Sequence, residues 1–114
     1  MARNYSDARP FNAAAGNVTA PAANTAAVKS IAAVPGKRHV LAFLGWSYSA
    51  APTGGSIKVE DGAGTTVFDL AIAVAGHDML PMAIRGSINT AMVITLAAGG
   101  GVVVGRLNTA SYTE

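Results

Sequence analysis

The stretch from Ser56 to Ala73 carries the clearest alternation of apolar and polar residues in the chain. Ile57 and Val59 alternate with polar neighbours, which is the period of two shown by a strand with one buried face. Asp61–Gly64 supplies a turn, because glycine reaches positive φ without a steric penalty. Thr65–Ala73 then returns as a β-branched and aromatic run. The apolar side chains expected on one face of the returning strand are Phe68, Leu70 and Ile72. The pattern predicts a β-hairpin.

Five other segments have the character of short strands and are separated by glycine and proline turn signals. They are Ala27–Ala32, His39–Ser49, Met82–Ile88, Thr90–Leu96 and Val102–Tyr112. Val74–Pro81 is typical of a crossing loop, and no segment shows a sustained period of 3.6, so we expect little helix. Together with the hairpin, these segments predict an antiparallel sandwich or barrel of about seven strands. The pairing order stays open, because jelly-roll and immunoglobulin-like sandwiches share this local pattern.

The longest predicted strand, His39–Ser49, has two unequal faces. One face is apolar throughout, and the other begins apolar and ends with two serines. The first face consists of Val40, Ala42, Leu44, Trp46 and Tyr48, and the second of Leu41, Phe43, Ser47 and Ser49. We expect a strand that is buried on both sides at its start and faces solvent on one side at its end.

Met1–Asn24 has no hydrophobic period of either kind and is interrupted by two prolines. It cannot bury enough apolar surface to offset its ordering entropy. We therefore expect a domain at 25–114 preceded by an extended N-terminal arm at 1–24, which is either a disordered tail or an arm that orders on a partner. In the second case its apolar anchors and charged contacts would be Tyr5, Phe11, Arg3 and Arg9.

The composition limits the classes of partner. Charged residues make up 12% of the 114 residues, about half the usual share of about 25%. Such a surface is poorly defended against association, so we expect a homo-oligomer. A net charge of +2, without a run of basic residues, does not indicate nucleic acid. The absence of cysteine excludes disulfides and thiolate metal sites, and it fits synthesis in a reducing cytoplasm.

Two further patterns bear on membranes and secretion. The first ten residues contain no apolar core of a secretory signal. Gly86–Gly105 is uncharged and long enough to span a bilayer. Its polar residues, its three consecutive glycines and its β-branched residues favour two buried strands instead, so we expect no membrane partner.

The residues that carry chemistry form no motif typical of catalysis or metal binding. His39 and His77 are the only histidines, with no ligand spacing between them. Ser87, His77 and Asp69 are the residue types of a catalytic triad, but the G-x-S-x-G motif that would support one is absent. We therefore expect no enzyme, catalytic residue, metal, cofactor or small-molecule substrate.

Three other features have a structural and a functional interpretation. Glu60 and Asp61 are interpreted as solvated turn residues rather than a glycosidase pair. The glycine-rich runs are interpreted as turns, because neither precedes a helix that could hold an anion. Trp46 and Tyr48 are interpreted as core residues, with a sugar-stacking platform as the alternative.

The chain resembles the small jelly-roll decoration proteins, also called cement or head-stabilising proteins, on the heads of tailed bacteriophages. The resemblance lies in SIKVEDGAGTTVFDLAIAVAG followed by LPMAIRGSINTAMVITLAAGGGVVVGRLNTASY, within residues 37–112. It implies an all-β, antiparallel β-sandwich of jelly-roll type with about seven to eight strands, which forms dimers or trimers. It assigns no binding residue by position.

The resemblance also implies a function. The protein would be a virion structural protein on the outer capsid surface, made in the host cytoplasm and bound to the major capsid protein across several subunits. The alternatives are a virion-borne carbohydrate- or receptor-binding module, or a tail or fibre component.

Overall fold

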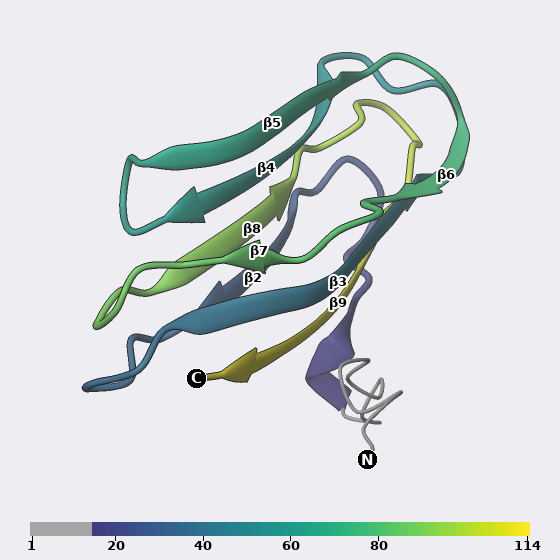
Figure 1. The fold of residues 1–114 in the computed structure, drawn as a ribbon. Coiled ribbons are helices and arrows are strands. Elements are labelled where there is room, and N and C mark those ends of the chain that lie inside the picture. Colours follow the sequence, from purple (N-terminus) through teal and green to yellow (C-terminus); the bar gives the residue numbers. More distant parts are fainter. Residues whose placement is uncertain (1–14) are drawn as a thin grey trace.

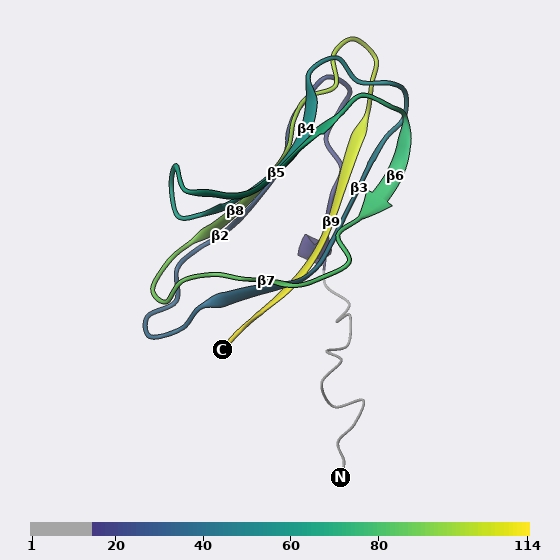
Figure 2. The ribbon, with the colours of Figure 1, turned by 45° about the horizontal axis from the view of Figure 1, so that its top comes forward.

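The computed structural model describes residues 15–114, which form two antiparallel β-sheets packed face to face (Figures 1 and 2). A three-residue 3-10 helix, η2 (Ala15–Asn17), precedes the strands. Sheet A contains β1 (Val18–Thr19), β3 (His39–Tyr48), β6 (Gly76–Met79), β7 (Ile84–Arg85) and β9 (Gly105–Thr113). Sheet B contains β2 (Ala27–Ile31), β4 (Gly55–Asp61), β5 (Thr66–Ile72) and β8 (Met92–Leu96).

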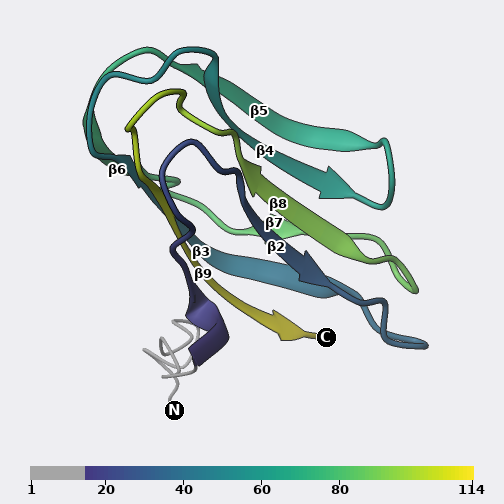
Figure 3. The same ribbon diagram turned by 180° about the vertical axis from the view of Figure 1, so that it is seen from behind.

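The order of the strands is that of a jelly roll. Sheet A runs β1-β9-β3-β6, and sheet B runs β2-β8-β4-β5, as Figure 3 shows from behind. Because β6 and β7 pair with opposite halves of β3, they form one interrupted strand at the edge of sheet A. Each sheet therefore has four positions, and the chain crosses to the other sheet at every connection except those from β4 to β5 and from β6 to β7. The predicted fold class, an antiparallel β-sandwich of jelly-roll type, is confirmed.

The predicted hairpin is present as β4 and β5. Ile57 and Val59 have no exposed surface and belong to the core between the sheets. Gly62 and Gly64 have φ values of 83° and 80°, the left-handed conformation that the turn requires and glycine adopts at little cost. The alternation placed Leu70 on the buried face of the returning strand, but its side chain is 44% exposed.

A β-bulge in β3 corrects the predicted faces of this strand. The pairing of β3 with β9 shifts register between Leu41 and Phe43. An extra residue at a bulge inverts the alternation of side chains. Leu41 therefore enters the core with Leu44, whereas Val40 is buried outside the core cluster. The prediction that Val40 and Ala42 share the face of Leu44 is wrong.

Three other expectations about strands need correction. The predicted crossing loop contains β6, a strand of polar and small residues whose alternation gives no apolar face. Only β8 lies wholly within Gly86–Gly105, where two buried strands were expected. β9 begins at Gly105, and Val102 before it is 85% exposed. Within residues 15–114, no helix is long and apolar enough to cross a membrane.

Part of the predicted arm lies against the sandwich. Val18 and Thr19 pair with Asn108 and Leu107 of β9. Farther along, the backbone N–H of Asn24 donates to the carbonyl oxygen of Val103 at 2.9 Å. The division of the chain at residue 24 stays a prediction.

Tyr48 contributes a buried polar group to the core. Its side chain is 2% exposed, and its hydroxyl donates to the carbonyl oxygen of Ala97 at 2.6 Å. Burial raises the pKa of the Tyr48 hydroxyl, and a backbone hydrogen bond at Ser56 opposes this effect. An unfolded tyrosine titrates near pH 10. The neutral hydroxyl therefore contributes its full stability below about pH 10, and this contribution is lost as pH rises through the higher pKa of the folded state.

We expect Tyr48→Phe to lower the free energy of unfolding by about 1 kcal/mol at neutral pH, because the bond to Ala97 is lost. The variant should also lose less stability above pH 10 than the parent protein does. Urea unfolding at neutral and alkaline pH measures both effects. Tyr112→Phe, which leaves Tyr48 intact, should keep the parent's alkaline loss. An unchanged alkaline loss in Tyr48→Phe would contradict the assignment.

Candidate functional site

His39 has a structural role at one end of the sandwich. The side chain is 4% exposed, and its Nε2 lies 2.7 Å from the carbonyl oxygen of Ala32. Because a carbonyl only accepts, Nε2 carries the proton and donates it. The bond links the start of β3 to the segment that follows β2. Because Nε2 is engaged in this bond, it is not free to bind a ligand.

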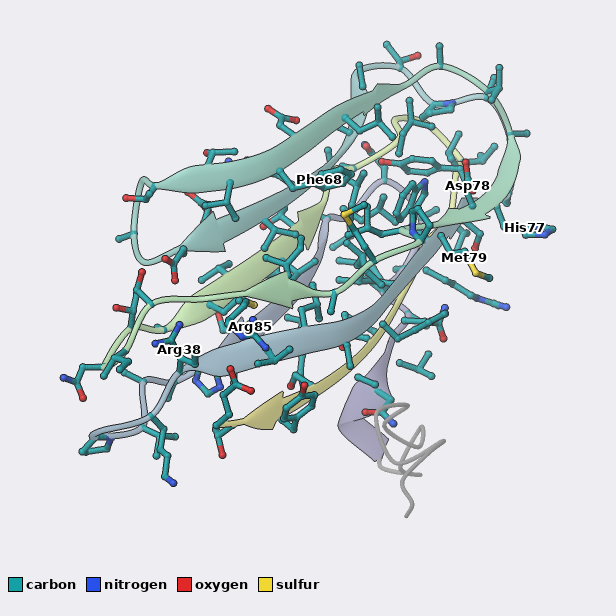
Figure 4. All side chains as sticks on the ribbon, viewed as in Figure 1. Arg38, Phe68, His77, Asp78, Met79 and Arg85 are labelled. Atoms are coloured by element: carbon teal, nitrogen blue, oxygen red, sulfur yellow. The ribbon has the colours of Figure 1, made fainter. Side chains whose placement is uncertain are left out.

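His77 lies at the opposite end of β3 and is exposed. It pairs with Ser47, eight residues along β3 from His39, and at about 3.3 Å per residue this places the two histidines about 26 Å apart. Figure 4 shows His77 directed away from the sandwich. Within the described residues, no group of three or more His, Asp or Glu side chains could hold a metal ion.

The structure does not bring Ser87, His77 and Asp69 together as a catalytic triad. Ser87 contacts Asp61 instead: its Oγ donates to Asp61 Oδ2 at 2.6 Å, and its backbone N–H donates to Oδ1 at 3.0 Å. Asp61 ends β4 in sheet B, whereas Ser87 follows β7 in sheet A. The carboxylate therefore links the two sheets through solvent-exposed hydrogen bonds, and Asp61 ends β4 instead of lying in the turn as expected.

Gly86 permits this link. A Cβ atom at Gly86 would lie 2.9 Å from Asp61 Oδ1 and 3.1 Å from Met92 Cε. The glycine N–H also donates to the carbonyl oxygen of His39 at 2.8 Å. Any side chain at this position would therefore displace the carboxylate or a core residue.

Trp46 and Tyr48 do not form an exposed platform. They are 6% and 2% exposed and belong to the core cluster. Their interpretation as core residues is confirmed, and a sugar could not stack on the faces of these rings without opening the sandwich.

A hollow of about 360 Å³ lies on the outer surface beside β6. It is lined by Phe43, Gly45, Trp46, Ser47, His77, Asp78, Met79 and Asn108. The Phe43 ring lies close to Gly45, where a Cβ would be 3.1 Å from Phe43 Cζ. The carboxylate of Asp78 accepts from the backbone N–H of Met79 at 2.8 Å. The hollow thus combines an apolar floor with a few polar groups, without a cluster suited to covalent chemistry.

Exposed apolar side chains gather at the side of the sandwich formed by β5, β6 and β7. Those on or next to these strands are Val67, Leu70, Val74 and Met82, each 44–70% exposed. Phe68, Ile72, Leu80 and Ile84 lie beside them and are partly buried against the core. Figure 4 shows Phe68 between β5 and the segment that joins β6 to β7. This apolar seam, the eight residues just named, is the described surface most suited to contact with another macromolecule.

The alternation of residues did not indicate the seam, because it placed Leu70 on a buried face. It also did not identify the Asp61–Ser87 link, which joins residues 26 positions apart. The glycine directly before Ser87 was the one available signal for this close approach. The predicted arm residues Arg3, Tyr5, Arg9 and Phe11 lie outside the described residues. No family model and no curated protein matches the chain.

We expect Asp61→Ala to lower the free energy of unfolding by about 1–2 kcal/mol, because two solvent-exposed hydrogen bonds to a charged acceptor are lost. Ser87→Ala removes only the hydroxyl bond and should cost less, about 0.5–1 kcal/mol. Since the two side chains act together, the double variant should be about as stable as Asp61→Ala. Urea unfolding of all three variants gives the coupling energy.

Asp69→Ala is the matched control. Asp69 is exposed, and its replacement should change stability by less than about 0.5 kcal/mol. If the effects of Asp61→Ala and Ser87→Ala simply add, the two side chains are not coupled and the proposed link between the sheets is wrong.

Proposed function

We propose that the protein is a non-enzymatic virion structural protein that decorates the outer surface of a phage capsid. The observation that carries this proposal is the jelly-roll strand order, which is the fold that the resemblance to phage decoration proteins implies. Fold alone does not assign a function. The surface and the composition supply the remaining support.

The surface is suited to association rather than to catalysis. Charged residues are sparse, at 12% of the chain, and an apolar seam is exposed at one side of the sandwich. Contact with a large, fixed partner would cover this surface and remove its apolar side chains from water. The major capsid protein, repeated over a lattice, is the partner that we propose.

The mechanism is thermodynamic linkage. A protein that binds across several capsid subunits binds the assembled lattice and not the separated subunits, so it stabilises the assembled state by mass action. If the decorating protein is itself a dimer or trimer, each further contact is made at a high effective concentration. A modest contact by each copy then becomes tight attachment to the particle.

In this proposal the N-terminal arm makes the capsid contact, with Tyr5 and Phe11 as apolar anchors and Arg3 and Arg9 as charged contacts. The described chain begins at η2, beside β1 on the edge of sheet A (Figure 1). The 14 residues before it could reach about 46 Å if extended, at about 3.3 Å per residue. An arm of this length would contact a partner surface beyond the sandwich while the sandwich remains folded.

A carbohydrate- or receptor-binding module remains the alternative, as does a tail or fibre component. The burial of Trp46 and Tyr48 removes the stacking surface on which the carbohydrate alternative rested. Localisation of the protein in an intact particle by electron microscopy separates a head component from a tail component.

We expect the variant R3A/Y5A/R9A/F11A to bind heads that lack the protein at least about 100-fold more weakly than the parent protein. Each buried aromatic anchor contributes about 1.5–3 kcal/mol, so the loss of two accounts for this change. Cosedimentation of the full-length protein with such heads measures the affinity.

The control variant N4A/S6A/N12A alters the same segment without the proposed contacts and should bind as the parent protein does. Full binding by R3A/Y5A/R9A/F11A would refute the role of the arm. Failure of the parent protein to bind heads would refute the proposed function itself.

A further inference from the structure

The edges of the two sheets differ in how they are protected against pairing with another strand. An unprotected edge presents free backbone donors and acceptors, and most proteins block it. The edge strands among the described residues are β1 and the interrupted β6–β7 strand in sheet A, and β2 and β5 in sheet B.

Three of these edges are blocked. β1 is only two residues long. The β6–β7 edge is interrupted, and Pro81, which lies in the gap, has no N–H to donate. β2 carries an inward charge: Lys29 pairs with the buried Ile94, so both side chains lie on the inner face. An inward lysine at an edge is a common protection against strand addition.

β5 has none of these features over most of its length. Its one irregularity is at its start, where Val59 pairs with Phe68 and Glu60 pairs with Thr66, so that Val67 is the extra residue of a bulge. From Phe68 to Ile72 the register is regular, and this segment contains no proline and no lysine. β5 therefore offers a straight edge of five residues.

The backbone groups on the free side of β5 can be identified. The carbonyl oxygen of Ser56 accepts from the N–H of Ala97, so the backbone of Ser56 faces β8. Because these groups alternate along an antiparallel strand, Ile57 faces β5 and pairs with Leu70. Leu70 thus faces β4, and the N–H and C=O groups of Asp69 and Ala71 point to the free edge.

We propose that two copies of this chain pair through the free edges of β5, antiparallel and centred on Leu70. In this register Asp69 of each copy lies opposite Ala71 of the other. These are the residues whose free backbone groups can exchange hydrogen bonds, giving four in total. The two four-stranded B sheets then become one sheet of eight strands.

The side chains of β5 favour a second copy in this register. Phe68 lies opposite Ile72, and Leu70 lies opposite its own symmetry mate, so the partly exposed inner face of each copy is covered by the other. A register centred on Asp69 would place two carboxylates opposite each other and would bring the bulged Val67 into the pairing. Self-complementarity of one patch is the requirement of a two-fold interface. The inference concerns self-association and is independent of capsid binding.

The first test is the self-association of the full-length protein, followed by sedimentation velocity over a range of concentrations. We expect a reversible dimer in the parent protein. Ala71→Pro removes an N–H that points away from β4, so the strand keeps its pairing with β4. Two intermolecular bonds are lost per dimer, and the dissociation constant should rise by at least about 30-fold. Ala71→Ser, which keeps the N–H, should dimerise as the parent protein does.

The second test measures the register. The chain has no cysteine, so Leu70→Cys and Ala71→Cys each introduce a single thiol. Residue 70 would face its own mate as a non-hydrogen-bonded pair with Cα atoms about 4.5 Å apart, which permits a disulfide. Residue 71 would face residue 69 and could not link to itself in the dimer. Under mild oxidation we expect Leu70→Cys to form a covalent dimer much faster than Ala71→Cys.

A parent protein that stays monomeric at all concentrations would overturn the proposal, as would equal dimerisation of Ala71→Pro in folded form. If Ala71→Pro does not fold, the comparison of crosslinking between Leu70→Cys and Ala71→Cys tests the proposed dimer. Equal or slower crosslinking of Leu70→Cys would then reject the register centred on Leu70.

Discussion

Strand β3 runs the length of sheet A, and the bulge between Leu41 and Phe43 sets which of its side chains reach the core. Without the extra residue, Leu41 and Leu44 would point to opposite faces of the sheet. With it, both enter the core, and the strand buries apolar residues along its whole length. β9 on one side of β3 and the β6–β7 strand on the other then take their register from this strand.

The same bulge explains a buried residue outside the core. Val40 points to the outer face, where its cross-strand neighbours are Tyr112 and Arg85. The Arg85 side chain forms an ion pair with Glu114, whose backbone pairs with Arg38 beside the same site. Val40 is 1% exposed although it lies outside the core cluster between the sheets.

The alternation of residues predicted the elements of the fold better than their partners. Ile57 and Val59 follow the period of two, and both are fully buried in the strand where they were expected. The bulge in β3 has no local signal, because the sequence around it is apolar on both faces. β6 was missed for a related reason: Gly76–Met79 forms an edge strand through backbone pairing with β3, and its side chains are all exposed. Pairing of this kind depends on the neighbour and not on the strand's own pattern.

The roles of individual residues were harder to predict from the sequence than the fold. Asp61 and Ser87 meet only because their strands belong to facing sheets, and the local sequence contains no information about that meeting. For His39, Trp46 and Tyr48, burial decided between a structural and a functional interpretation. Sequence can propose such residues, but their solvent exposure follows from the tertiary packing.

Protection of the edges follows from the way a jelly roll is closed. The fold buries the inner faces of both sheets but leaves four edges, because neither sheet closes on itself. Here three of the four edges are protected, by shortness in β1, by interruption around Pro81 and by the inward Lys29 in β2. β5 lacks these devices, and the adjoining sheet A edge leaves its inner face half covered, with Leu70 at 44% exposure. A chain with so few charges has little other means to keep such an edge from association. The exposure of β5 is therefore best explained as an interface and not as a defect of packing.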